Sequence, residues 1–338
     1  MDNTVDLERE VGACSTFHWG IYNGLVGLLT RDRGQSVAIE LIKTTMRAEQ
    51  GARYVEGLQK LGIDLAEPPA VKAAKYHYLS NTIGGLSLEY YRESDRKAWI
   101  RYRAPVGSSP GSGLAYVPRD VRKAVFMTWH PNNGKLMGCP NLQWVLTKLS
   151  CDGHPHDEGY FIERDEEVPL EARGIMADED PPVRRFPKDG YPQLNPGQWP
   201  PLRRTKAMRN FGHDYFVASL RRIATIVGDV PAEAYVSLAA RLTAIQMQDA
   251  FAPPEQETPE HWMAVLASYL TRDAASLQSG PGNEFVTPYE SGRRGRLPAV
   301  AIQVFLNTLS ELLDADCSYH VSSGDRYQLK AGKRGESV

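Results

Sequence analysis

Eight of the chain's 23 prolines fall between Asp165 and Arg204, and this proline-rich segment divides the sequence into three parts. The segment has no apolar periodicity that would let it pack as a regular helix or strand. We therefore predict an N-terminal half at residues 1–164, a linker or surface-wrapping arm at 165–204, and a C-terminal half at 205–338.

The composition is typical of a globular protein without a bulk electrostatic role. The 338 residues are 42% hydrophobic and 24% charged, and they carry a formal net charge of -2. This balance argues against binding to nucleic acid or to an anionic membrane surface. There is no apolar run long enough for a transmembrane helix, and the N-terminus does not resemble a signal peptide. The four cysteines form no CxxC pair and no disulfide framework, so we expect a reducing, cytoplasmic location.

Helical periodicity predominates in both halves of the sequence. In the first half it predicts a helix ending near Leu29, one long or two shorter helices at 35–61, and helices at 69–83, 119–129 and 141–149. In the second half it predicts helices at 206–227, 232–251, 259–270 and 297–313.

Strand-like segments are fewer and shorter. Residues 86–93 and 96–104 are rich in β-branched and aromatic side chains on either side of a Ser-Asp turn, which predicts a hairpin. A third strand is predicted at 159–163, and a second hairpin at 317–321 and 326–329. The predicted class is therefore α+β, rich in helices, with short antiparallel hairpins. The order of helices before strands in both halves suggests two similar α+β halves.

The densest set of reactive side chains is the Cys-Asp-Gly-His-Pro-His-Asp-Glu sequence at residues 151–158. In an extended segment, residues two apart point to the same side, so His154, His156 and Glu158 would share one side. Nitrogen and carboxylate ligands together suit zinc or ferrous iron, so one hypothesis is a divalent metal site. A second is covalent catalysis by Cys151, with the histidines lowering its pKa and relaying protons. A third is a polar surface turn.

Further candidate residues lie outside this cluster. Cys139 precedes a predicted helix, whose dipole would favour a thiolate, and His130 follows another helix and would reach the site through the fold. On the second predicted strand, Trp99, Arg101 and Arg103 share one face. Their guanidinium groups would hold a substrate carboxylate, the alternative being a solvated strand face.

The chain resembles the bacterial L-2-amino-thiazoline-4-carboxylic acid hydrolase-like family in several short pieces covering about half its length. The order of a helix, a hairpin with an acidic and aromatic first strand, and a cysteine-bearing segment carries the resemblance. The pieces are Gly84–Glu89, the strand through Ile100, and Leu149–Asp152. The closing Asp314–Tyr319 is similar to the end of that family and of the related vinyl-reductase-type ligand-binding domains. The resemblance implies hydrolysis of a small carboxylated heterocycle, or a pocket for a small organic ligand.

Two main functional hypotheses follow. The first is an enzyme of hydrolase or lyase type that acts on a small, carboxylated or heterocyclic substrate. Its site would use Cys151, His154, His156 and Glu158, with Cys139 and His130 as further candidates. The second is a non-catalytic small-molecule-binding or sensory protein with an apolar pocket. A weaker third hypothesis is a scaffold that associates through the proline-rich segment, and the sequence leaves a homo-oligomer open.

Overall fold

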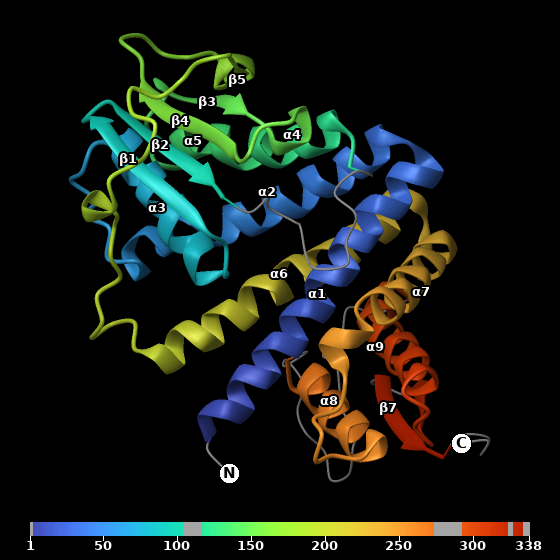
Figure 1. The fold of residues 1–338 in the computed structure, drawn as a ribbon. Helices are drawn as coiled ribbons and strands as arrows, with labels where there is room; N and C mark the ends of the chain where they lie inside the picture. Colours follow the sequence, from blue (N-terminus) through green and yellow to red (C-terminus); the bar gives the residue numbers. More distant parts are fainter. Residues whose placement is uncertain (1–2, 104–116, 274–292, 324–326, 334–338) are drawn as a thin grey trace. The chain divides into compact units, whose positions relative to one another are not determined.

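The computed structural model describes residues 3–103, 117–273, 293–323 and 327–333, and it shows the predicted helix-rich α+β fold (Figure 1). The described residues form two compact units. The sheet unit lies within 42–208, and the helical unit combines residues before 42 with those from 209 onward. This grouping joins the proline-rich segment to the sheet and the first helix to the C-terminal part, whereas the sequence suggested boundaries at 164 and 204.

The sheet unit contains helices and strands that come before residue 104 in the sequence and others that come after it. Its strands are β1 (Leu88–Ser94), β2 (Lys97–Tyr102), β3 (Leu142–Lys148), β4 (Asp157–Glu163) and β5 (Gly174–Met176). Its helices are most of α2 (Gln35–Lys60), α3 (Pro69–Ile83), α4 (Arg119–Trp129), α5 (Asn133–Leu136) and the start of α6 (Pro201–Val227). Single 3-10 turns lie at His130–Asn132, Ser150–Asp152, Leu170–Ala172 and Lys188–Gly190.

The five strands form one sheet in the order β1-β2-β4-β3-β5. All neighbours are antiparallel except β3 and β5, which are parallel. The register places Trp99 opposite Tyr160 and Arg101 opposite Glu158 on β2 and β4. Because side chains alternate along a strand, these four residues lie on one face of the sheet, which we call the outer face.

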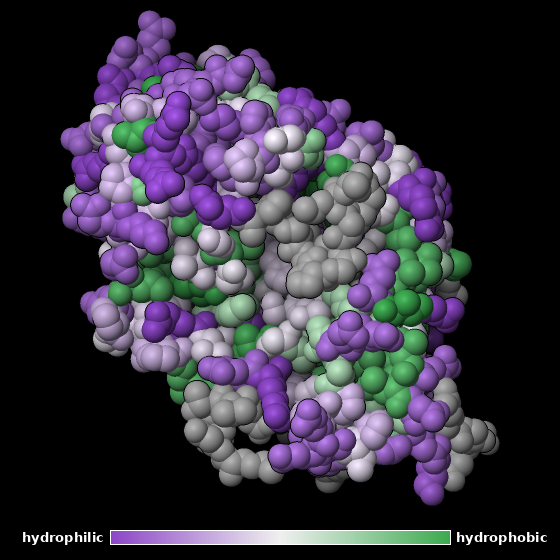
Figure 2. Space-filling model, viewed as in Figure 1, coloured by the Kyte–Doolittle hydropathy of each residue, from purple (hydrophilic) through white to green (hydrophobic). Residues whose placement is uncertain are grey.

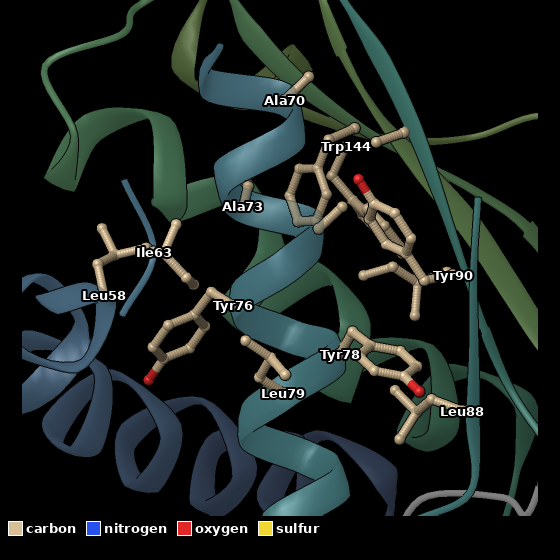
Figure 3. Packing of buried hydrophobic residues seen from close by; sticks show 14 of the residues in the cluster. Leu58, Ile63, Ala70, Ala73, Tyr76, Tyr78, Leu79, Leu88, Tyr90 and Trp144 are labelled. Carbon is tan, nitrogen blue, oxygen red and sulfur yellow. The ribbon is translucent and has the colours of Figure 1, made fainter. Parts of the chain in front are cut away.

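The inner face of the sheet packs against α3, which contacts β1, β2 and β4. Figure 3 shows α3 between Trp144 and Tyr90 on the sheet side and Leu58 of α2 on the other side. A helix buried on both sides needs small residues, and α3 supplies Ala70 and Ala73, both without exposed surface. Burial of this continuous apolar cluster is the main stabilising term of the unit.

Close packing within the sheet depends on one glycine. A Cβ at Gly159 would lie 2.5 Å from Trp144 Cζ2 and 2.5 Å from the Val145 carbonyl oxygen. Only a residue without a side chain leaves room for the Trp144 indole at this point of β4.

The helix predicted at 141–149 is wrong, because these residues form β3. Leu142 to Thr147 are all buried, so both faces of the strand are covered and the polar alternation of a surface strand is missing. A short buried run of this kind has no period that separates a strand from a helix. By contrast, 69–83 and 119–129 are helical as predicted, the first hairpin is present, and residues 35–60 form a single helix.

The helical unit contains α1 (Asn3–Arg33), the rest of α6, α7 (Asp229–Gln246), α8 (Pro259–Asp273) and α9 (Arg293–Leu312). A 3-10 turn at Gln248–Phe251 follows α7, and the hairpin of β6 (Ser318–Ser323) and β7 (Tyr327–Gly332) follows α9. The centre of the unit is aromatic: the Phe17 ring lies 4.9 Å from Phe305 and 5.4 Å from Phe216.

Helices α1 and α7 approach each other closely. A Cβ at Gly20 would lie 2.4 Å from Thr243 Cγ2, and one at Gly24 would lie 3.1 Å from Ala239 Cβ. The second predicted hairpin is present and is tied to α9 by Asn307, whose side chain exchanges two hydrogen bonds with the Tyr319 backbone. Within the described ranges, no helix is long and apolar enough to span a membrane.

Candidate functional site

The cluster at residues 151–158 forms the connection between β3 and β4. A 3-10 turn covers Ser150–Asp152, and Gly153 ends it with φ of 92°, a left-handed conformation that favours glycine. Asp157 fixes this connection: its carboxylate accepts hydrogen bonds from the Ser150 backbone N–H at 2.8 Å and from the Ser150 hydroxyl at 3.0 Å. The other oxygen of Asp157 pairs with Arg122 of α4. Asp157 therefore holds the turn in place.

Glu158 points to the outer face and is the centre of a buried charged network. Its side chain has no exposed surface, and its carboxylate accepts a short hydrogen bond from Arg101 Nε. The Thr147 hydroxyl donates to Glu158 Oε1 at 3.1 Å, and Lys148 Nζ lies 3.3 Å from the same oxygen. His156 Nε2 lies 3.3 Å from Glu158 Oε2.

This network keeps Glu158 ionised. Burial alone would raise the pKa of its carboxyl group, but the hydrogen bonds from His156 and Arg101 and the charges of Arg101 and Lys148 outweigh burial and lower the pKa to about 2. Glu158 is therefore a carboxylate at neutral pH, although it is fully buried.

His156 reaches the surface, with 15% of its side chain exposed, the same fraction as for Lys148. Its Nε2 faces the carboxylate of Glu158. No hydrogen bond joins its other ring nitrogen, Nδ1, to any residue in the described part of the chain. A carboxylate that accepts from one imidazole nitrogen selects the tautomer in which the other nitrogen carries the lone pair. Nδ1 is thus available to accept a proton.

The predicted substrate-binding face of β2 is largely covered. Trp99 has no exposed surface. The Arg101 guanidinium stacks on the Phe186 ring, with its carbon atom 3.8 Å from the ring centroid. Arg101 Nη1 also donates to the Arg184 carbonyl oxygen at 2.8 Å. Only Arg103 of the three predicted residues is exposed, with its Nη1 3.2 Å from Glu89 Oε1. The alternative prediction was a strand face in contact with solvent. It does not hold at Trp99 and Arg101, because both side chains are buried.

The proline-rich segment provides this cover. Glu179 accepts hydrogen bonds from Lys97 Nζ, at 2.8 Å, and from the Tyr160 hydroxyl. Asp180 pairs with Lys148, and Phe186 packs in the outer-face cluster formed by Trp99, Val145 and Tyr160. We call residues 177–186 the strap, because acidic side chains and one phenylalanine fasten them to β2, β3 and β4.

The remaining members of the cluster are placed at the surface. Cys151 and His154 are both exposed. Partial burial of the Cys151 sulfur, together with the charges of Asp152 and Asp157, raises the pKa of this thiol above its ordinary value. The described ranges contain no group of three or more His, Cys, Asp or Glu side chains that could hold a metal ion. The structure therefore brings His156 and Glu158 together, but it does not place Cys151 as an activated thiolate.

The prediction that Cys139 precedes a helix is wrong, because Cys139 lies just before strand β3. It is buried, and its thiol lies 3.0 Å from Asn141 Oδ1. Burial and the nearby charge of Glu163 raise the pKa of this thiol. The helix dipole that would have favoured a thiolate is missing at this position.

His130 is buried on the inner face, away from the surface. Its ring stacks on His77 with centroids 4.0 Å apart, and its Nε2 lies 2.9 Å from the Tyr102 hydroxyl. Asn133 Nδ2 lies 2.7 Å from His77 Nε2, and Gln50 bridges to Asn133 at 2.7 Å. Burial lowers the pKa of both imidazoles, that of His77 to about 3, so both are neutral.

Sequence reasoning missed Lys148 and the strap. Lys148 would have been placed beside Glu158 if residues 142–148 had been interpreted as a strand adjacent to β4. Phe186 lies in a segment without periodicity, and the run Asp178-Glu179-Asp180 was its only visible signal. Comparison of the chain with known family models, curated proteins and solved structures finds no match, so the family resemblance stays an expectation.

Proposed function

We propose that the chain is an enzyme of hydrolase or lyase type that acts on a small organic substrate, with His156 as its proton-transfer residue. The observation that carries this proposal is the contact between His156 Nε2 and Glu158 Oε2 at 3.3 Å. A partly exposed imidazole beside a buried, ionised carboxylate is an arrangement that supports general acid–base catalysis.

The chemistry of the pair follows from its protonation. With Nε2–H directed to Glu158, the lone pair of His156 Nδ1 accepts a proton, either from an attacking water molecule or from a substrate C–H group. The imidazolium formed is stabilised by the Glu158 carboxylate, which keeps its own charge because its pKa is about 2. His156 then returns the proton to the leaving group, which completes a hydrolysis or an elimination.

Lys148 is the group beside the pair that would bind an acidic substrate. Lys148 Nζ lies 3.3 Å from Glu158 Oε1, and 15% of the Lys148 side chain is exposed. Its second partner, Asp180, is largely exposed. A substrate carboxylate that replaced the exposed Asp180 at this ammonium group would be held beside the proton-transfer residue. This agrees with the substrate class that the family resemblance implies.

A cysteine mechanism and a metal mechanism are less well supported. The raised pKa of Cys151 disfavours the thiolate that a nucleophile needs. The carboxylate oxygens of Glu158 already accept from Arg101, Thr147 and His156, so a metal ion would have to displace these donors.

The test is a turnover screen against carboxylated heterocycles, amides and hydroxy acids, using wild type, His156→Ala, His154→Ala and Cys151→Ser. Loss of the proton-transfer group should lower kcat/KM by about 10²- to 10⁴-fold in the His156 variant. The other two variants should keep activity near that of wild type. Full activity of folded His156→Ala would overturn the proposal. Tight ligand binding without turnover would favour the non-catalytic alternative.

A further inference from the structure

Helix α7 of the helical unit is apolar on two opposite sides. Its inner side is buried and consists mainly of small residues, among them Val236, Ala239, Ala240 and Ala244. A surface helix of a globular protein normally has a polar outer side. Apolar residues on two opposite sides of a helix are typical of a helix that is covered on both sides.

The outer side of α7 carries an apolar stripe. Its residues are spaced four and three apart, so they follow one face of the helix: Val230, Ala234, Leu238, Leu242 and Ile245. Val230 is 65% exposed and Ile245 is 46% exposed, and the other three are exposed or half-buried. Figure 2 shows apolar colour gathered over the part of the molecule where Figure 1 draws α7 and α9. A continuous apolar stripe of this kind marks an interaction site.

We infer that a second copy of this chain covers the stripe, with the two α7 helices packed antiparallel about a two-fold axis near Leu238. The sequence of the stripe is self-complementary about this point. Leu238 would meet Leu238 of the second copy, and the small Ala234 would meet the larger Leu242. Val230, eight positions before Leu238, would lie next to Ile245, seven positions after it. A two-fold interface requires this kind of self-complementarity, since the same surface serves both partners.

The charges beside the stripe are also placed symmetrically, about Ser237, one position before Leu238. Glu233 and Arg241 lie on the same edge of the stripe and at equal distances from Ser237. In an antiparallel pair, equivalent edges of the two helices face each other, so Glu233 of each copy would meet Arg241 of the other. Arg241 is exposed, and among the described residues Glu233 has one ion-pair partner, Arg296, at 3.7 Å. A parallel arrangement would instead bring like charges to the same level.

The first test is sedimentation velocity of the full chain at about 10 μM, a concentration suited to micromolar association. Wild type should be a dimer, and Val230→Glu/Ile245→Glu should weaken association by about 100-fold. Leu170→Glu is the matched control, because Leu170 is also 65% exposed but lies in the sheet unit. A monomeric wild type, or a folded double variant that dimerises like wild type, would overturn the inference.

The second test addresses the antiparallel register. Arg241→Glu and Glu233→Lys should each weaken self-association, whereas an equimolar mixture of the two should form a heterodimer with restored opposite charges. Lysine at 233 would also face Arg296, so the circular dichroism spectrum and Tm of that variant are measured alongside. If it does not fold, Arg241→Glu alone decides. Unchanged dimerisation of folded Arg241→Glu would contradict this register.

Discussion

Arg101 of β2 and Glu158 of β4 lie opposite each other in the sheet, and their side chains form a buried ion pair on its outer face. Both side chains have further hydrogen-bond partners: Glu89 and the Arg184 carbonyl for Arg101, and Thr147 and His156 for Glu158. Such a pair costs desolvation energy and holds only while both partners are present. The pair therefore links the stability of the sheet to the orientation of His156.

Replacing Glu158 by Gln should lower the free energy of unfolding by about 3–5 kcal/mol, because it leaves the buried Arg101 charge with only the longer ion pair to Glu89, at 3.4 Å. The control is Arg103→Gln, at an exposed ion pair with Glu89, which should cost less than about 1 kcal/mol. Urea unfolding followed by circular dichroism measures both. Equal losses in the two variants would show that burial of the pair has no energetic consequence.

Stability should fall steadily as the pH is lowered from neutrality. His77 has its pKa lowered from 6.5 to about 3 by burial, so its contribution is complete above pH 6.5 and is lost as the pH falls to 3. The hydrogen bonds and charges of His156, Arg101 and Lys148 outweigh burial and lower the pKa of Glu158 from 4.5 to about 2. The contribution of Glu158 is therefore lost between pH 4.5 and 2. The Glu158 contribution amounts to about 3 kcal/mol.

The two groups can be separated by comparing urea unfolding at several pH values in wild type and His77→Gln. The decline between pH 6.5 and 4.5 should be shallower in the variant, whereas the decline below pH 4.5 should persist. Identical slopes above pH 4.5 would mean that the buried His77 does not resist protonation.

Replacing Gly159 by Ala should destabilise the protein by about 1–3 kcal/mol, because the new methyl group would overlap the Trp144 ring and a backbone oxygen. Gly190 is a matched control in the same unit, since a Cβ there would meet nothing within 4 Å. Thermal unfolding of Gly159→Ala and Gly190→Ala distinguishes the two sites. A similar Tm for both variants would contradict the close packing of β3 on β4.

Replacing Phe186 by Ala should cost about 3–5 kcal/mol, because the ring is buried in the outer-face cluster and stacks on the Arg101 guanidinium. Lys188→Ala changes an exposed residue two positions later and should stay within about 0.5 kcal/mol of wild type. Urea midpoints report the difference. If Phe186→Ala behaved like Lys188→Ala, the strap would not be part of the folded core.

The sequence predicts the helices and hairpins whose periods are clear, and it places His156 and Glu158 on one side because alternation is a local property. It does not predict that Arg101 meets Glu158, because these residues are 57 positions apart in the chain and their contact depends on the register between two strands. It also misses β3, where burial on both faces removes alternation. The strap is held by isolated side-chain contacts, and these leave no period in the sequence.

The buried histidines show the same limit. His130 stands out in the sequence beside Trp129 and Pro131, but its stacking partner His77 lies on a different helix and has no distinctive neighbours. Only the fold shows that the two rings stack in the interior and that His130 is buried away from solvent.

The most direct test of the His156–Glu158 pair is the tautomer of neutral His156 in the wild-type protein. A long-range ¹H–¹⁵N correlation spectrum reports which ring nitrogen carries the proton, and comparison with His156→Gln assigns the signals. We expect the Nε2–H tautomer, with Nε2 donating to Glu158 and the lone pair on Nδ1. An Nδ1–H tautomer would contradict the account, because the nitrogen that must accept a proton would already carry one.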